Sequence, residues 1–210
     1  MTTIVVALLI AAAVVAAVDW WAVASGRRPV EYVCKPLVLV LLIAMAVALH
    51  PAVGARREWF LAALVFSLAG DVLLMLPDDL FVAGLGSFLA GHLCYIAGLT
   101  RHGGAGSTVA LAALAVAVVA TVPASRILPA VKRGSPKLLA PVAVYMVVIS
   151  AMVAAAAATG VALAACGAIL FWVSDASIAW DRFVRPWSWA RTWIMVTYHL
   201  GQAALVLSLI

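Results

Sequence analysis

The sequence predicts an all-α integral membrane protein with eight transmembrane helices, forming a single transmembrane domain over residues 1–210. Hydrophobic residues make up 68% of the chain and charged residues only 10%, whereas a soluble domain carries roughly 25% charged residues. The apolar residues also fall into eight long stretches with short connections. Because about 20 apolar residues are enough to cross a bilayer, each stretch is expected to be one spanning helix.

Residues that break helices mark the connections. Glycine or proline occurs at or near each of them, and the shortest connections are Pro77-Asp78-Asp79 and Thr159-Gly160. Pro129, Gly134 and Pro136 predict a longer connection after the fifth helix. We expect the helices at about 4–24, 33–50, 58–76, 80–100, 107–124, 138–158, 161–180 and 190–210.

Lysine and arginine predict the orientation of these helices. Ten of them lie at the connections between the first and second, third and fourth, fifth and sixth, and seventh and eighth helices, which share one side of the membrane. The other three, Arg56, Arg57 and Arg101, lie on the opposite side. The positive-inside rule places the ten-charge side in the cytoplasm and both termini outside, in a plasma membrane or bacterial inner membrane. We attribute the net charge of +5 to contact with membrane lipids, so no nucleic-acid partner is expected.

A weak internal repeat of 102–105 residues is present in the sequence, and chance is the alternative explanation. If it is real, the first four helices correspond to the last four in a parallel 4+4 arrangement, with matching residues at equal membrane depth. The matching pairs are Lys35 with Lys137, Phe66 with Phe171, Asp71 with Asp175, and Tyr95 with Tyr198.

Asp71 and Asp175 are the candidate catalytic residues. A carboxylate at the centre of a bilayer costs ~2.5–3.5 kcal/mol on insertion scales, which calls for a functional explanation. Each lies about five residues, or ~7–8 Å, inside the cytoplasmic end of its helix. Equal depth predicts that they meet in one cavity. The alternative is that each is a hydrogen-bonded packing group.

Other polar residues lie at compatible levels and are candidate binding residues. His92 and Tyr95 share one helix face, as do Tyr198 and Gln202, and Tyr145 lies within the sixth helix. The alternatives are a packing role for His92 and anchoring at the head groups for Tyr198.

Three further polar residues lie near the predicted cytoplasmic side. Lys35 precedes Pro36 at the expected entry of the second helix, where it either contributes to the site or extends to the head groups. Ser67 is one turn before Asp71, where it could hydrogen-bond to it. Asp19 is expected at the membrane interface, and the alternative is that it joins the site.

No sequence motif indicates a soluble hydrolase or a cofactor. The chain contains no GxSxG, HExxH or Walker motif, so no cofactor is expected. The three cysteines have no CxxC spacing and are expected to be apolar helix residues. His92, Asp71 and Asp175 together would supply three metal ligands, but their spacing does not indicate a metal.

The ordered set of these residues resembles the YhhN family of membrane lysoplasmalogenases, which includes the animal transmembrane protein 86 enzymes. One departure is Thr197, where the resemblance leads us to expect a second tyrosine beside Tyr198. The matching elements are Lys35-Pro36, Phe66 to Asp71, Phe81-x-x-Gly84-x-x-x-Phe88-x-x-x-His92-x-x-Tyr95, Tyr145, Gly167-Ala168-x-x-Phe171-x-x-Ser174-Asp175, and Tyr198-x-x-x-Gln202.

The resemblance implies hydrolysis of the vinyl ether bond of a lysophospholipid, releasing a fatty aldehyde and a glycerophospho-base. Such a reaction begins with protonation of an alkene carbon, so an acid and a second carboxylate suit it, as in glycosidases with paired carboxylates. Asp71 and Asp175 would be that pair. The expected substrate-binding residues are Lys35, His92, Tyr95, Tyr145, Tyr198 and Gln202.

Two other functions fit parts of the sequence. Intramembrane carboxylates also serve as proton relays in transporters, although the polar residues here gather in the cytoplasmic half of the helices. A metal-dependent lipid hydrolase using His92 and the aspartates is the other alternative.

Overall fold

The computed structural model describes residues 2–50, 54–101 and 106–210, which form eight α-helices and two short helical turns. The all-α prediction is confirmed for these residues. The helices are α1 (Thr3–Ala24), α2 (Arg28–Ala48), α3 (Gly54–Met75), α4 (Phe81–Thr100), α5 (Gly106–Gly134), α6 (Leu139–Ala158), α7 (Ala162–Ala179) and α8 (Ala190–Leu207).

Seven of the eight helices are long and apolar enough to cross a membrane, which identifies an integral membrane protein. The exception is α8, whose polar residues include Arg191, His199 and Gln202. The prediction of eight spanning helices is therefore confirmed for seven. Most of the polar side chains of α8 are buried against other helices, so its composition suits the interior of the bundle rather than lipid.

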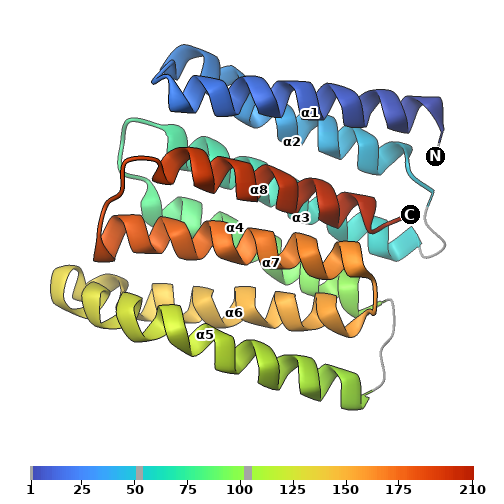
Figure 1. The fold of residues 1–210 in the computed structure, drawn as a ribbon. Helices are drawn as coiled ribbons and strands as arrows, with labels where there is room; N and C mark the ends of the chain where they lie inside the picture. The colour runs from blue at the N-terminus through green and yellow to red at the C-terminus, as the bar shows by residue number, and fades with distance from the viewer. Residues whose placement is uncertain (1, 51–53, 102–105) are drawn as a thin grey trace.

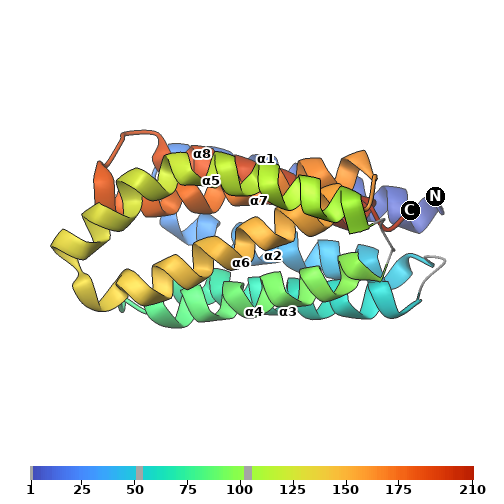
Figure 2. The same cartoon turned by 90° about the horizontal axis from the view of Figure 1, so that it is seen from below.

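The helices form a bundle of two layers (Figures 1 and 2). One layer contains α1, α8, α7 and α5, and the other contains α2, α3, α4 and α6. Consecutive helices pair as antiparallel hairpins, and the pairs α3–α4 and α7–α8 pack along most of their length. The two termini lie at the same end of the bundle (Figure 1).

Two predicted helix boundaries are wrong because proline did not end a helix. The fifth helix continues through Pro123 and Pro129 to Gly134, and η1 (Pro136–Leu138) follows as a short 3₁₀ turn. The second helix begins at Arg28 with Pro29 in its first turn and continues through Pro36. A proline removes one backbone hydrogen bond, a loss that neighbouring groups offset in membrane helices.

The α3–α4 and α6–α7 connections lie where the sequence predicted them, whereas the expected breakers Pro51, Gly103 and Gly104 lie outside the described residues. Gly26 and Gly160 adopt positive φ angles of 68° and 71° and end α1 and α6, which only glycine does at little cost. The end of α7 differs, because the chain continues as a π-helical turn, η2 (Trp180–Val184), before Pro186. This turn directs Trp180 and Phe183 toward α5 and α6.

Small residues bring α7 and α8 into backbone contact. A Cβ atom on Gly167 would lie 2.9 Å from the Gly201 carbonyl oxygen and 2.8 Å from the Leu205 nitrogen. Close approach of this kind is a common way for membrane helices to pack, since dispersion rather than the hydrophobic effect holds them together. It places Asp175 on α7 and Tyr198 on α8 at fixed positions in the bundle.

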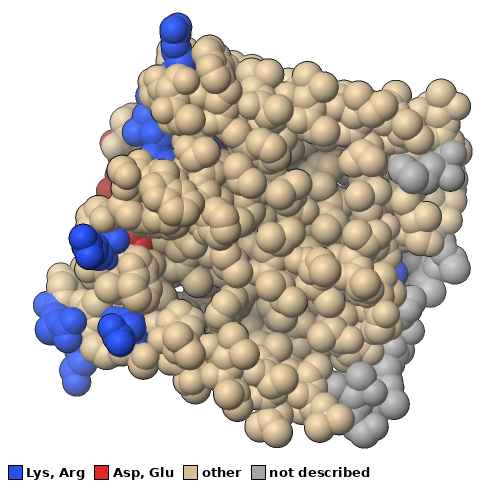
Figure 3. Space-filling view, in the orientation of Figure 1, with Lys and Arg blue, Asp and Glu red and all other residues tan. Residues whose placement is uncertain are grey.

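Lysine and arginine gather at one end of the molecule (Figure 3). This end carries the α1–α2, α3–α4, α5–α6 and α7–α8 connections, while the termini lie at the opposite end. The charge asymmetry expected from the sequence is therefore present. The cytoplasmic assignment of this end and the 4+4 repeat both stay predictions.

Candidate active site

Asp71 lies inside the bundle on α3 and is bound from two other helices. Its Oδ1 is 3.1 Å from the Lys35 Nζ on α2, and its Oδ2 accepts a hydrogen bond of 2.7 Å from the Tyr198 hydroxyl on α8. Gln202 extends this cluster, because its Nε2 lies 3.4 Å from the Tyr198 hydroxyl and its Oε1 accepts a hydrogen bond from Tyr95. Of the predicted binding residues, Lys35 and Tyr198 thus contact the predicted catalytic residue Asp71, and Gln202 and Tyr95 join the same cluster through Tyr198.

The position of Lys35 differs from the sequence prediction. Because α2 begins at Arg28, Lys35 lies about two turns, or ~10 Å, inside the helix rather than at its entry. Its side chain is 8% exposed, so it does not extend to the head groups. An ammonium group this deep needs a nearby anion, and Asp71 is that anion.

Asp175 lies on α7 and is bound by the other two predicted residues. The Tyr145 hydroxyl on α6 donates a hydrogen bond to Asp175 Oδ2. The His92 Nε2 on α4 is 2.9 Å from the Tyr145 hydroxyl oxygen and 3.2 Å from Asp175 Oδ2. Since Tyr145 gives its only proton to Asp175, both neighbours of His92 accept, and the proton of the neutral imidazole is assigned to Nε2.

The two carboxylates belong to adjoining clusters and do not bond to each other in the part of the chain that the structure describes. Phe171 lies between the clusters, with its ring centroid 4.7 Å from that of His92 and 5.2 Å from that of Tyr198. Phe88 packs edge-on against Phe171 and Tyr198. The arrangement therefore favours separate roles for Asp71 and Asp175 over one proton shared between them.

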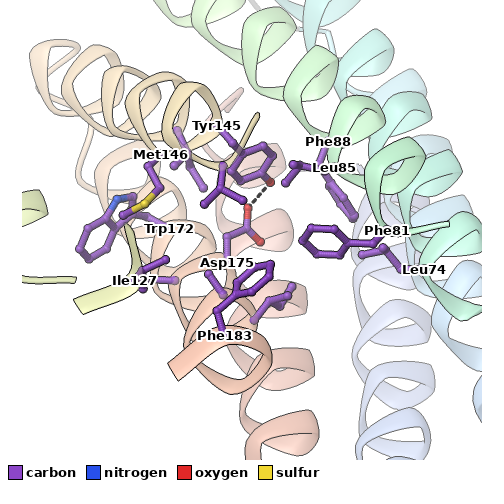
Figure 4. A pocket seen from close by; sticks show the side chains of 15 residues that line it. Leu74, Phe81, Leu85, Phe88, Ile127, Tyr145, Met146, Trp172, Asp175 and Phe183 are labelled. Carbon is purple, nitrogen blue, oxygen red and sulfur yellow. Dashed lines mark hydrogen bonds between the residues drawn. The ribbon is translucent and has the colours of Figure 1, made fainter. Parts of the chain in front are cut away.

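An apolar cavity lies beside Asp175 (Figure 4). We call it the Asp175 cavity. It encloses about 50 Å³, which is room for one or two water molecules. One Asp175 oxygen bonds to Tyr145 and the other points toward Phe81 (Figure 4). The other residues that line the Asp175 cavity include Leu74, Phe88, Met146, Trp172, Ile178 and Phe183.

A charged vestibule of about 400 Å³ lies beside this cavity, at the end of the bundle rich in lysine and arginine. Leu74, Phe81 and Ile178 belong to the walls of both spaces. Lys35 lines the vestibule and also binds Asp71, so the vestibule is connected to the Asp71 cluster through this side chain. The remaining charged residues of the vestibule are Arg28, Glu31, Asp181, Arg182 and Arg191.

Besides the Lys35–Asp71 pair, two ion pairs hold charged side chains of the vestibule, those of Arg191 and Glu31 and that of Arg182. The Arg191 Nη2 lies 2.7 Å from both carboxylate oxygens of the buried Glu31. The Arg182 Nη2 donates to Asp79 Oδ2 at 2.8 Å, and this hydrogen bond holds the pKa of Asp79 below its usual value. Sequence reasoning missed the Glu31–Arg191 pair, since 160 residues separate its members and no motif joins them.

Asp19, Ser67 and Thr197, which the sequence singled out, form none of the site contacts described above. Asp19 is fully buried rather than interfacial, because α1 packs this face against α2 and α8. Ser67 does not bond to Asp71, as its hydroxyl has no partner among the described residues. The Thr197 hydroxyl bonds to the backbone carbonyls of Trp193 and Ile194, so the departure at this position adds no polar group to the site.

No metal-binding cluster of three or more His, Cys, Asp or Glu occurs within residues 2–50, 54–101 and 106–210. His92 and Asp175 are in contact, but the partners of Asp71 are Lys35 and Tyr198. The three ligands that the sequence suggested are therefore divided between two clusters.

The bundle and its buried ionisable clusters define the class of the molecule as a polytopic membrane protein with an intramembrane polar site. Comparison with known families is more specific, because residues 30–209 match the YhhN family. The chain therefore belongs to the YhhN family, as its resemblance implied. No solved structure matches it at a significant level.

Relatives from bacteria and mammals that are named lysoplasmalogenase are similar to most of the chain. A Mycobacterium bovis protein named lysoplasmalogenase is 35% identical over 189 residues, covering 82% of this chain and 71% of the relative. Lysoplasmalogenase TMEM86B of Homo sapiens is 32% identical over 155 residues, covering 74% of this chain and 65% of the relative. The Mus musculus TMEM86B is 32% identical over 179 residues, with coverage of 83% and 72%.

Proposed function

We propose that this protein is a membrane hydrolase that cleaves the vinyl ether bond of lysoplasmalogens, releasing a fatty aldehyde and a glycerophospho-base. The relatives named lysoplasmalogenase support the reaction. The observation that carries the proposal for this chain is the common wall of Leu74, Phe81 and Ile178 between a charged vestibule and an apolar cavity. A single-chain lipid needs both environments within one molecule's length.

The substrate is placed by matching its chemistry to the two spaces. The phosphate of the head group lies in the vestibule near Arg28 and Arg182, and the chain enters the apolar side near Phe88 and Met146. The vinyl ether, which joins head and chain, then lies near the common wall. The Asp175 cavity is smaller than an alkyl chain, so binding has to displace side chains that line it, and the unbranched Met146 is the most adaptable of them.

Asp71 is assigned the role of the fixed carboxylate. Both of its oxygens accept from donors, Lys35 and Tyr198, which is the hydrogen-bonding pattern of an ionised carboxylate. A carboxylate held in this way stabilises a positive charge that develops nearby, because little solvent competes inside the bundle.

Asp175 is assigned the role of the acid. One of its oxygens faces the cavity without a hydrogen bond from the described residues (Figure 4), so a proton carried there contacts the substrate. The proton adds to the alkene carbon that does not bear oxygen, which leaves an oxocarbenium ion. Water adds to that ion and returns a proton to Asp175. The hemiacetal then collapses to aldehyde and alcohol, and no net proton is consumed.

A transporter is the less favoured alternative, because no observation supports a polar path through the opposite half of the bundle. The charged residues of the vestibule lie at one end, and the relatives carry an enzyme name.

The decisive experiment is mass spectrometry of the products that the purified protein forms from matched lysolipids carrying a vinyl ether, an alkyl ether or an ester. Aldehyde is expected from the vinyl ether alone. Asp71→Asn and Asp175→Asn are each expected to abolish its release while leaving membrane insertion unchanged. Full activity of either variant would contradict the two-carboxylate mechanism, and absence of aldehyde from the unmodified protein would contradict the substrate class.

A further inference from the structure

A second apolar space lies outside the proposed active site, in a groove formed mainly by α1 and α8, with α2 and α7 completing its walls. It measures about 470 Å³, within the range of small-molecule sites. On α1 its wall runs from Leu9 to Trp20, or ~16 Å at the rise of a helix. None of its lining residues carries a formal charge. Residues on the other helices of the wall include Leu42, Leu163, His199 and Leu207.

His199 is the unusual member of this wall. It is 2% exposed, and its Nε2 has no hydrogen-bond partner in the described part of the chain. Its Nδ1 accepts a hydrogen bond of 3.1 Å from the Trp20 indole N–H. An indole is only a donor, so Nδ1 carries no proton and the neutral ring carries its proton on Nε2. A buried N–H donor without an acceptor costs free energy.

The chemistry of the groove defines what fits it. Apolar walls select a hydrocarbon chain. The Nε2–H donor of His199 at the Trp20 end is covered in the structure, so a neutral oxygen acceptor at the end of that chain reaches it once a lining side chain moves aside. A phosphate or ammonium group would be buried without a counter-charge, at a high cost.

We propose that this groove is a binding site for a long, single-chain lipid ending in a carbonyl, with the His199 Nε2–H donating to the carbonyl oxygen and the chain lying along α1 toward Leu9 and Leu207. The fatty aldehyde released by the proposed hydrolysis has this chemistry. The identity of the natural ligand therefore rests on the proposed function, whereas the binding site itself does not.

Photolabelling tests the site directly. The probe is a long-chain methyl ketone with a diazirine near the far end of the chain, added to the protein in phosphatidylcholine nanodiscs. Phosphatidylcholine is in excess, so bilayer phospholipid competes in every measurement. Labels are expected on α1 near Leu9 and on α8 near Leu207, and a hydrocarbon probe of equal length is expected to label these positions about tenfold less. Equal labelling by both probes would overturn the assignment of His199 as the recognising donor.

Variants separate recognition from general lipid contact. His199→Phe keeps an aromatic ring but removes the donor, and it is expected to lower ketone labelling about tenfold. Ala13→Leu narrows the groove two turns of α1 away from Trp20 and is expected to lower labelling by both probes, so the test stands if His199→Phe does not fold. Leu93→Phe, a substitution on an exposed face of α4, is the matched control. Unchanged labelling in both groove variants would overturn the proposal.

The same labelling of the Asp175→Asn variant distinguishes this proposal from the proposed function. Its ketone labelling is expected to equal that of the unmodified protein, because Asp175 does not line the groove. Ketone labelling without any aldehyde release from the unmodified protein would support the groove and contradict the hydrolase. Aldehyde release without specific ketone labelling would support the hydrolase and contradict the groove as a binding site.

Discussion

Lys35 and Asp71 form an ion pair inside the helix bundle, with 3.1 Å between Nζ and Oδ1 and side chains that are only 8% and 2% exposed. A buried pair of this kind contributes little to stability compared with apolar residues of similar volume, yet removing one member leaves a buried charge. The difference in stability between removing one member and replacing both therefore shows whether the pair has a structural or a functional role.

Lys35→Met is expected to destabilise the protein by roughly 3–5 kcal/mol, because Asp71 loses its cation. The double variant Lys35→Met/Asp71→Leu is expected to recover most of that loss while remaining inactive. Thermal unfolding in detergent measures the first quantity, and aldehyde release measures the second. A double variant as unstable as the single one would mean that the pair mainly stabilises the fold.

Arg28→Gln is expected to raise KM for the lysolipid about tenfold, equivalent to ~1.4 kcal/mol of binding, with little change in kcat. Arg28 lines the vestibule and forms no ion pair with the described residues, so its guanidinium is available to a phosphate. Arg133→Gln, an exposed position in the last turn of α5, removes the same charge outside the vestibule and serves as the control. Equal effects of the two substitutions would point to general attraction by surface charge.

Ala117→Phe is expected to reduce activity on long-chain substrates more than on short-chain ones. Ala117 lines an open apolar groove of about 400 Å³ between α5 and α6, and Met146 belongs both to this groove and to the Asp175 cavity. A chain that passes Met146 enters the groove, where a phenyl ring would block it. The neighbouring Val118 is 61% exposed, so Val118→Phe is the matched control. Identical chain-length profiles for the two variants would exclude this route.

The spanning segments could be predicted from the sequence because their cause is local. In a bilayer each helix has to satisfy its backbone groups within its own segment, so length and hydropathy are sufficient to locate it. The same local reasoning failed at Pro29 and Pro129, which were expected to lie in connections but belong to helices. A proline weakens a helix locally, but the surrounding bundle determines whether it ends there.

The intramembrane site could be predicted only in part. The sequence identified Asp71 and Asp175 by the cost of placing a carboxylate in a membrane, and helical spacing added His92 with Tyr95 and Tyr198 with Gln202. The sequence did not predict how these residues are distributed between two clusters. The Asp71 cluster contains Lys35, Tyr198, Gln202 and Tyr95, and the Asp175 cluster contains His92 and Tyr145.

The sequence by itself therefore determined that the chain is a membrane protein, where its helices lie approximately, the charge asymmetry, and two of the carboxylates inside the bundle, Asp71 and Asp175. The tertiary structure alone decided which side chains pair, which face of α1 buries Asp19, and that Phe171 lies between the two clusters. The physical reason is the separation along the chain between the residues that interact. Insertion into a bilayer depends on one segment at a time, whereas Tyr198 meets Asp71 across 127 residues of chain, through helix rotations and contacts that no single segment specifies.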